Sequence, residues 1–259
     1  MKQKYDVVYS IGRDCACAMY MKSAHLRTCS GPFDWLTNAT FETRIDLIVN
    51  DFRDFLNRDD IAPLKKDPTR PNDETCDYYQ NIRNDFYYYH DFPVGVPFDK
   101  SFPDVSEKYR RRIVRFYDNV NKSKRVLFIW FSQYTDTPDD LLIDASDRIC
   151  KKFGKQIDFL VIEHSNNVSP ATKRQIAKNI VRYNLHTRIY DDGGNLDTLG
   201  LTKFVKPIYL QYAVKEPIGL VIRRGFRRIL ADVVCLFLPI HGVRGRVKHF
   251  IRGKYNKYY

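Results

Sequence analysis

The chain has 259 residues, of which 44% are hydrophobic and 14% aromatic, and this composition can bury the core of one large domain. Six cysteines and an N-terminus without the apolar stretch of a signal peptide exclude a disulfide-rich secreted scaffold, so we expect reduced thiols in a cytosol. No cysteine spacing suits zinc, because Cys15 and Cys17 are too close and no second pair follows them. We therefore predict neither a metal nor a cofactor.

The net charge of +12 is distributed unevenly along the chain. Residues 215–259 contain eleven Lys and Arg residues against two acidic residues, a local balance of +9 that leaves +3 for residues 1–214. We therefore predict two parts. Residues 1–214 form a nearly neutral catalytic domain, and residues 215–259 form a basic C-terminal tail.

Residues 5–15 are typical of a strand, a sharp turn and the start of a helix. Gly12 allows the turn, and Asp14 can cap a helix that begins at Cys15. We expect a lowered pKa for this thiol, because the helix dipole and the neighbouring Arg13 favour the thiolate. Cys15 is therefore the candidate nucleophile. The alternative is a small buried residue at the start of a core helix.

The rest of the body alternates predicted helices with predicted strands. The helices are expected at residues 41–56, 107–120, 138–153 and 170–183, and the later strands at residues 86–92, 125–131, 157–162 and 186–190. Residues 57–81 lack periodicity and contain three prolines, which indicates a long loop. The order of elements predicts an α/β fold with a mainly parallel sheet and helices on both faces, a Rossmann-like three-layer arrangement.

The residues that follow the strands form the predicted site, because ligands of open α/β sheets bind at the carboxyl ends of the strands. A thiol and a histidine at this edge are the minimum for nucleophilic catalysis. Two histidines are candidates for the base: His164, which follows a strand, and His90, which has Asp91 beside it. For each, a histidine satisfied by the backbone or exposed at the surface is the alternative. The residues expected to bind substrate are Ser10, Gly12, Arg13, Asp14, Trp35, Asp91 and Asn166.

Asp34 lies between two aromatic residues, and in a partly apolar site its charge needs a partner. Arg13, Arg27 or a protonated His90 could supply that partner. The alternative is a turn aspartate that caps the next helix or accepts hydrogen bonds from local amides.

Several short blocks are specific enough to compare with known families. They are residues 10–15, 26–27, 30–36, 90–92, 109–113 and 126–128, of which Ser-Gly-Pro-Phe-Asp-Trp at residues 30–35 is the most specific. Together they resemble a bacterial family of unknown function described as papain-like cysteine peptidases, over roughly residues 5–200. The resemblance implies a cysteine nucleophile at Cys15, a histidine at His90 and an acidic residue at Asp34.

The basic tail combines a helical apolar stripe with arginines that fall largely off it, which favours a basic amphipathic C-terminal helix. Its longest uncharged stretch, residues 233–243, is short of the roughly 20 residues that span a bilayer. We expect residues 218–259 to bind an anionic membrane surface at the inner face of the cell membrane. A helix docked on the body is the alternative, and nucleic acid is not expected, because no binding motif accompanies the charge.

Two functions from different classes follow. The first is a cysteine-dependent hydrolase or acyltransferase, with Cys15 as nucleophile, His90 or His164 as base and Asp34 as the residue that orients it. Its substrate is a small molecule, a glycan or a peptide, and the tail resembles those of enzymes of bacterial surface polysaccharide metabolism at the inner membrane. The second is a saccharide-modifying, glycosyltransferase-like enzyme at that membrane, in which Cys15 is structural. A membrane-associated binding domain is a third, non-catalytic alternative.

Overall fold

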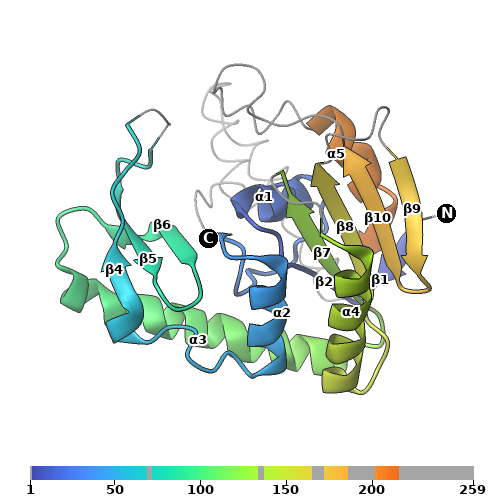
Figure 1. Cartoon of the computed structure of the whole chain (residues 1–259), viewed down its shortest axis with the longest axis horizontal. Helices are drawn as coiled ribbons and strands as arrows, with labels where there is room; N and C mark the ends of the chain where they lie inside the picture. The colour runs from blue at the N-terminus through green and yellow to red at the C-terminus, as the bar shows by residue number, and fades with distance from the viewer. Residues whose placement is uncertain (1, 69–71, 134–136, 165–171, 186–201, 216–259) are drawn as a thin grey trace, which may run out of the picture. The chain divides into compact units, whose positions relative to one another are not determined.

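The computed structural model describes residues 2–68, 72–133, 137–164, 172–185 and 202–215. The chain divides into two units, Met1–Val214 and Lys215–Tyr259, and the elements in Figure 1 belong to the first. The strand predicted at residues 186–190 and the helix predicted in the basic tail lie outside the described residues. Within the described ranges, none of the helices combines the length and the apolar character that a membrane span requires.

A five-stranded sheet forms the centre of the first unit. Its strands, in spatial order, are β2 (Val7–Ser10), β7 (Val126–Ser132), β8 (Asp158–His164), β10 (Ile180–Leu185) and β9 (Thr172–Ala177). The first four pair in parallel, and β9 pairs with β10 in antiparallel orientation. All seven residues of β7 are buried, as is typical of an apolar strand covered on both faces. The predicted α/β fold with a mainly parallel main sheet is confirmed.

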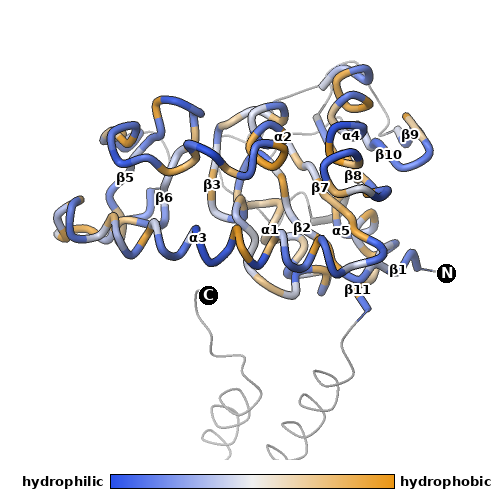
Figure 2. Tube along the Cα trace, turned by 90° about the horizontal axis from the view of Figure 1, so that it is seen from below, coloured by the Kyte–Doolittle hydropathy of each residue, from blue (hydrophilic) through white to orange (hydrophobic). Residues whose placement is uncertain are grey.

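Alternate residues of β7 contribute to two separate hydrophobic clusters. Leu127, Ile129 and Phe131 pack with α1 (Cys15–Ser23) and α5 (Thr202–Tyr209). Val126, Phe128 and Trp130 belong to the cluster that includes α2 (Phe41–Val49), α3 (Phe98–Lys122) and α4 (Asp139–Phe153). Figure 2 shows hydrophilic residues along much of α3, which agrees with its amphipathic sequence.

A second, antiparallel sheet stands beside the first, and it corrects the prediction of a long loop. Its order is β3 (Leu36–Asn38), β6 (Phe86–Pro93), β5 (Cys76–Asn81) and β4 (Ile61–Pro63), and a 3₁₀ helix (Arg58–Asp60) precedes β4. The loop prediction for residues 57–81 was wrong for β4 and β5, since a proline is tolerated in an edge strand such as β4. Two further strands, β1 (Gln3–Tyr5) and β11 (Tyr212–Val214), form a parallel pair.

Three predicted helices differ from the structure. The helix predicted at residues 170–183 was wrong, because this segment forms the β9–β10 hairpin, in which β10 pairs with the buried strand β8. The helix α2 ends at Val49, because residues 51, 52 and 54 have positive φ angles between 55° and 58°. The helix α3 is longer than residues 107–120 and begins at Phe98.

Candidate active site

The turn that carries Cys15 has the local structure that the sequence predicts. The helix α1 begins at Cys15, and the Asp14 side chain accepts a hydrogen bond of 2.9 Å from the amide of Ala16. Only glycine fits at position 12, because an added Cβ would lie 2.4 Å from Cβ of Cys17. The glycine and the N-cap therefore place the Cys15 thiol at the carboxyl end of β2, with Ser10 buried just before it.

The environment of the Cys15 thiol overturns the expected thiolate. The side chain is half-buried, and burial raises its pKa to about 12, with the charge of Asp14 acting in the same direction. Arg13 does not offset this effect, since its guanidinium donates hydrogen bonds of 3.0 and 3.1 Å to the backbone and side-chain oxygens of Asn38. The thiol is therefore protonated at neutral pH and needs a base before it can attack.

A fully buried arginine, which the sequence analysis did not select, lies beneath this turn. Arg44 of α2 donates hydrogen bonds to the backbone oxygens of Arg13 at 2.9 Å, Ala39 at 3.2 Å and Leu36 at 3.3 Å. Burial lowers its pKa to about 9, whereas the charge of Asp14 opposes that shift. Its position on the apolar face of an amphipathic helix is the signal that could have identified it. The aromatic rings around its guanidinium are those of Phe33, Phe86 and Trp130.

Asp34 is buried, and its carboxylate pairs with Arg27, one of the three predicted partners. One carboxylate oxygen accepts hydrogen bonds of 2.6 Å from Nε of Arg27 and 3.0 Å from the amide of Gly31. Burial raises the pKa of Asp34, and the charge of Arg27 opposes this shift. The ion pair therefore holds the family-specific block, residues 30–35, in a closed turn.

His90 is paired with a carboxylate that the sequence analysis did not select. Its Nδ1 atom lies 2.9 Å from an oxygen of Asp73, in the segment before β5. Burial works against ionisation of Asp73, but hydrogen bonds from Thr75 and His90 prevail and lower its pKa to about 2. The predicted neighbour, Asp91 of β6, is instead buried against α3, where it binds Lys108 and accepts a hydrogen bond of 2.8 Å from Tyr109. Adjacent residues of a strand face opposite sides, which explains the separation.

Trp35 connects these two pairs of residues. Its ring centre lies 5.8 Å from the imidazole of His90, at an interplanar angle of 80°, and 5.6 Å from the guanidinium carbon of Arg27. A continuous series of contacts therefore runs through five side chains, which we call the His90 cluster: Asp34, Arg27, Trp35, His90 and Asp73. Two of the three residues that the family resemblance selects, His90 and Asp34, belong to it.

Cys15 is not hydrogen-bonded to this cluster. Between the two described side chains of Cys15 and His90 there is no hydrogen bond. His164 is the last residue of β8, but its side chain and all of Asn166 lie outside the described residues. The roles of nucleophile and base therefore stay predictions. Across the described ranges, no group of three or more His, Cys, Asp or Glu side chains is placed to hold a metal ion.

Other polar groups near the carboxyl ends of the strands are engaged in structural contacts. Glu163 of β8 is fully buried and accepts hydrogen bonds from Trp130 at 2.7 Å and Arg182 at 2.8 Å. The buried thiol of Cys17 contacts the Tyr209 hydroxyl at 3.6 Å, and burial raises its pKa to about 12. These groups stabilise the sheet and α1, and we assign them no chemistry.

Comparisons with known proteins identify the family of the chain. A family model with the description "Putative papain-like cysteine peptidase" matches residues 6–167, which contain Cys15, Asp34, His90 and His164. An uncharacterized protein of Acanthamoeba polyphaga mimivirus is 26% identical over 172 residues, which span 62% of this chain and 72% of the viral protein. No solved structure matches the chain. Because the family model matches more than half of its residues, the chain belongs to this papain-like cysteine peptidase family.

Proposed function

We propose that the protein is a cysteine-dependent hydrolase or acyltransferase in which Cys15 is the nucleophile and His90, oriented by Asp73, is the base. The observation that carries this proposal is the 2.9 Å contact between Nδ1 of His90 and the carboxylate of Asp73. A carboxylate at Nδ1 holds the ring proton on that nitrogen and leaves Nε2 free to accept another. This is the arrangement that a catalytic cysteine needs from its base.

The raised pKa of Cys15 determines the order of the proposed steps. Nε2 of His90 takes the thiol proton as the sulfur attacks the carbonyl carbon of the substrate. The leaving group receives that proton, and a thioester remains on Cys15. Water, or an acceptor hydroxyl or amine in an acyltransferase, then attacks the thioester and returns the proton to the thiol. Backbone amides at the start of α1 are the candidate donors to the oxyanion.

One arrangement is required beyond those described. Sγ of Cys15 and Nε2 of His90 must come within about 3 Å, and catalytic hydrogen bonds commonly tighten only when substrate binds.

The ion pair of Arg27 with Asp34 supports the Trp35 ring against His90, so we propose a positioning role for Asp34. His164 is the competing candidate for the base.

Alkylation of the free thiols as a function of pH tests this proposal. The wild-type chain, Cys15→Ser, His90→Gln, Asp73→Asn and His164→Gln would be treated with iodoacetamide and mapped by mass spectrometry. We expect Cys15 to react near pH 7 faster than a thiol with a pKa of about 12 allows, and His90→Gln and Asp73→Asn to abolish that excess. If the faster alkylation of Cys15 is lost in His164→Gln alone, His164 and not His90 is the base.

A second candidate function rests on the burial of the Cys15 thiol. A half-buried thiol with a raised pKa also fits a structural cysteine, and therefore a saccharide-modifying, glycosyltransferase-like enzyme that uses other residues. Equal and slow alkylation of Cys15 in the four proteins that retain this residue would support this candidate and contradict the first.

We also propose a setting for the reaction and a finer description of the fold. The two hydrophobic clusters on the main sheet support a Rossmann-like three-layer arrangement. The eleven basic residues among residues 215–259 support binding to an anionic membrane surface, which fits a role in surface polysaccharide metabolism.

A further inference from the structure

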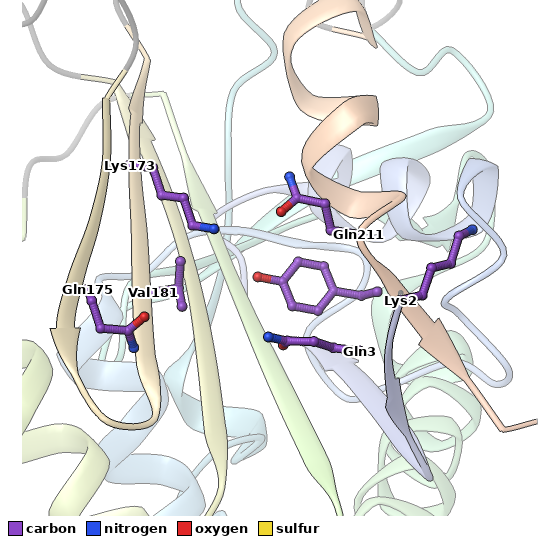
Figure 3. A pocket seen from close by; sticks show the side chains of 7 residues that line it. Lys2, Gln3, Lys173, Gln175, Val181 and Gln211 are labelled. Atoms are coloured by element: carbon purple, nitrogen blue, oxygen red, sulfur yellow. The ribbon is translucent and has the colours of Figure 1, made fainter.

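A cavity with its own set of polar side chains lies between the β1–β11 pair and the β9–β10 hairpin. Its volume is about 440 Å³, within the roughly 300 to 1,000 Å³ typical of small-molecule sites. It shares no lining residue with the candidate active site. The lining residues, shown in Figure 3, are Lys2, Gln3, Lys173, Gln175, Val181, Gln211 and Tyr212.

The lining offers hydrogen-bond donors and positive charge but no carboxylate. Figure 3 shows the Lys173 ammonium directed into the cavity from β9, and the Gln3 amide directed into it from β1. The Lys173 nitrogen lies 5.6 Å from the ring centre of Tyr183, and among the described residues it has no acidic partner. An ammonium group in this setting is available to an anion.

Tyr212 adds a hydrogen-bond donor to the same cavity. The residue is only 5% exposed, and its hydroxyl has no hydrogen-bond partner within the described ranges. The hydroxyl is not among the fully buried polar atoms that lack a partner, so it can donate a hydrogen bond to an acceptor atom in the cavity that Tyr212 lines. The carboxylate whose charge acts on this hydroxyl, Asp158, is already bound by Tyr5 at 2.7 Å and lies 3.9 Å from Arg125.

We propose that this cavity binds a small anionic ligand through a phosphoryl or carboxylate group. Lys173 pairs with its charge, while Tyr212 and the Gln3 amide donate hydrogen bonds to its oxygens. A stacked nucleobase is disfavoured, because the Tyr212 ring is buried near Tyr5, with 6.2 Å between ring centres. The proposal is independent of the reaction assigned to Cys15.

Calorimetric titration of the full chain with inorganic phosphate, and separately with acetate, tests the site at one fixed ionic strength. The variants are Lys173→Gln and Tyr212→Phe, and Lys178→Gln is the matched control, since Lys178 is an exposed lysine of the same hairpin. We expect saturable binding that Lys173→Gln weakens about tenfold, Tyr212→Phe weakens several-fold and Lys178→Gln leaves unchanged.

The preferred anion identifies the ligand class, a phosphate ester if phosphate binds more tightly and a carboxylic acid if acetate does. Lys173→Arg keeps the charge, and we expect it to retain most of the affinity. Absence of saturable binding by both anions would overturn the proposal. Equal weakening by Lys173→Gln and Lys178→Gln would also overturn it, because it would show general attraction to a basic surface.

Discussion

The guanidinium of Arg44 donates a hydrogen bond of 2.9 Å to the backbone oxygen of Arg13, two residues before the Cys15 thiol. The same guanidinium binds the backbone oxygen of Leu36, two residues after Asp34. One buried cation therefore joins the turn of the candidate nucleophile to the residue that directly follows the most specific family block, residues 30–35.

We predict that Arg44→Met destabilises the fold by about 2 to 4 kcal/mol, because two buried carbonyl groups and one partly buried carbonyl group lose their donor. Urea unfolding followed by circular dichroism measures the change. Arg53→Met is the control, since Arg53 is exposed, and it should cost less than about 0.5 kcal/mol. Equal stability of Arg44→Met and Arg53→Met would show that the Arg44 contacts do not hold the turn.

We predict that Gly12→Ala costs about 2 to 4 kcal/mol, since the new methyl group would lie 2.4 Å from Cβ and 2.8 Å from Sγ of Cys17. Gly95→Ala is the control. Gly95 has a φ of 77° but no atom near an added Cβ, so this substitution should cost about 1 kcal/mol. Thermal unfolding compares the two variants, and a Gly12→Ala protein as stable as Gly95→Ala would contradict the close packing of this turn.

We predict an acid-dependent contribution from Asp73, whose carboxylate interacts with Thr75 and His90. The pKa of Asp73 falls from 3.8 to about 2 on folding, so its stabilisation is fully present above pH 4 and is lost as the pH falls toward 2. The Asp73–His90 pair is partly exposed, so we expect less than about 1 kcal/mol. Unfolding temperatures of the wild type and Asp73→Asn between pH 2 and 5 should converge at the acid end. A constant difference over this range would exclude ionisation of Asp73 as the cause.

We predict that truncation after Val214 abolishes binding to anionic vesicles and leaves residues 1–214 folded. Each basic residue near such a surface contributes about 1 kcal/mol, and salt screens the attraction. Co-sedimentation with anionic and with neutral vesicles measures binding by the full and truncated chains. Equal binding by both chains, or binding by neither, would remove the proposed membrane role.

The sequence predicted those elements whose structure depends on residues close together in the chain. The start of α1 follows from Gly12 and Asp14 alone, and the apolar run of β7 indicated a strand buried on both faces. The β9–β10 hairpin could not be predicted in this way. Its residues fit a helical spacing, and the pairing of β10 with β8 overrides that tendency.

The site was predictable in its residue types but not in its contacts. The prediction of a thiolate at Cys15 relied on the helix start and on Arg13, which are both close in sequence. Burial by distant segments instead decides the pKa of this thiol. The partner of His90 is Asp73, 17 residues earlier, in a segment without periodicity, and only the pairing of β5 with β6 brings that segment beside His90.

Acyl transfer from p-nitrophenyl acetate near pH 7, followed by intact-protein and peptide mass spectrometry, tests the central claim most directly. We predict a burst of p-nitrophenolate of about one equivalent per chain and a single acetyl group on Cys15. Both should be absent in Cys15→Ala and strongly reduced in His90→Gln. Acetylation of lysines or other cysteines with Cys15 unmodified, at the same rate in wild type and Cys15→Ala, would contradict the assignment of Cys15 as the nucleophile.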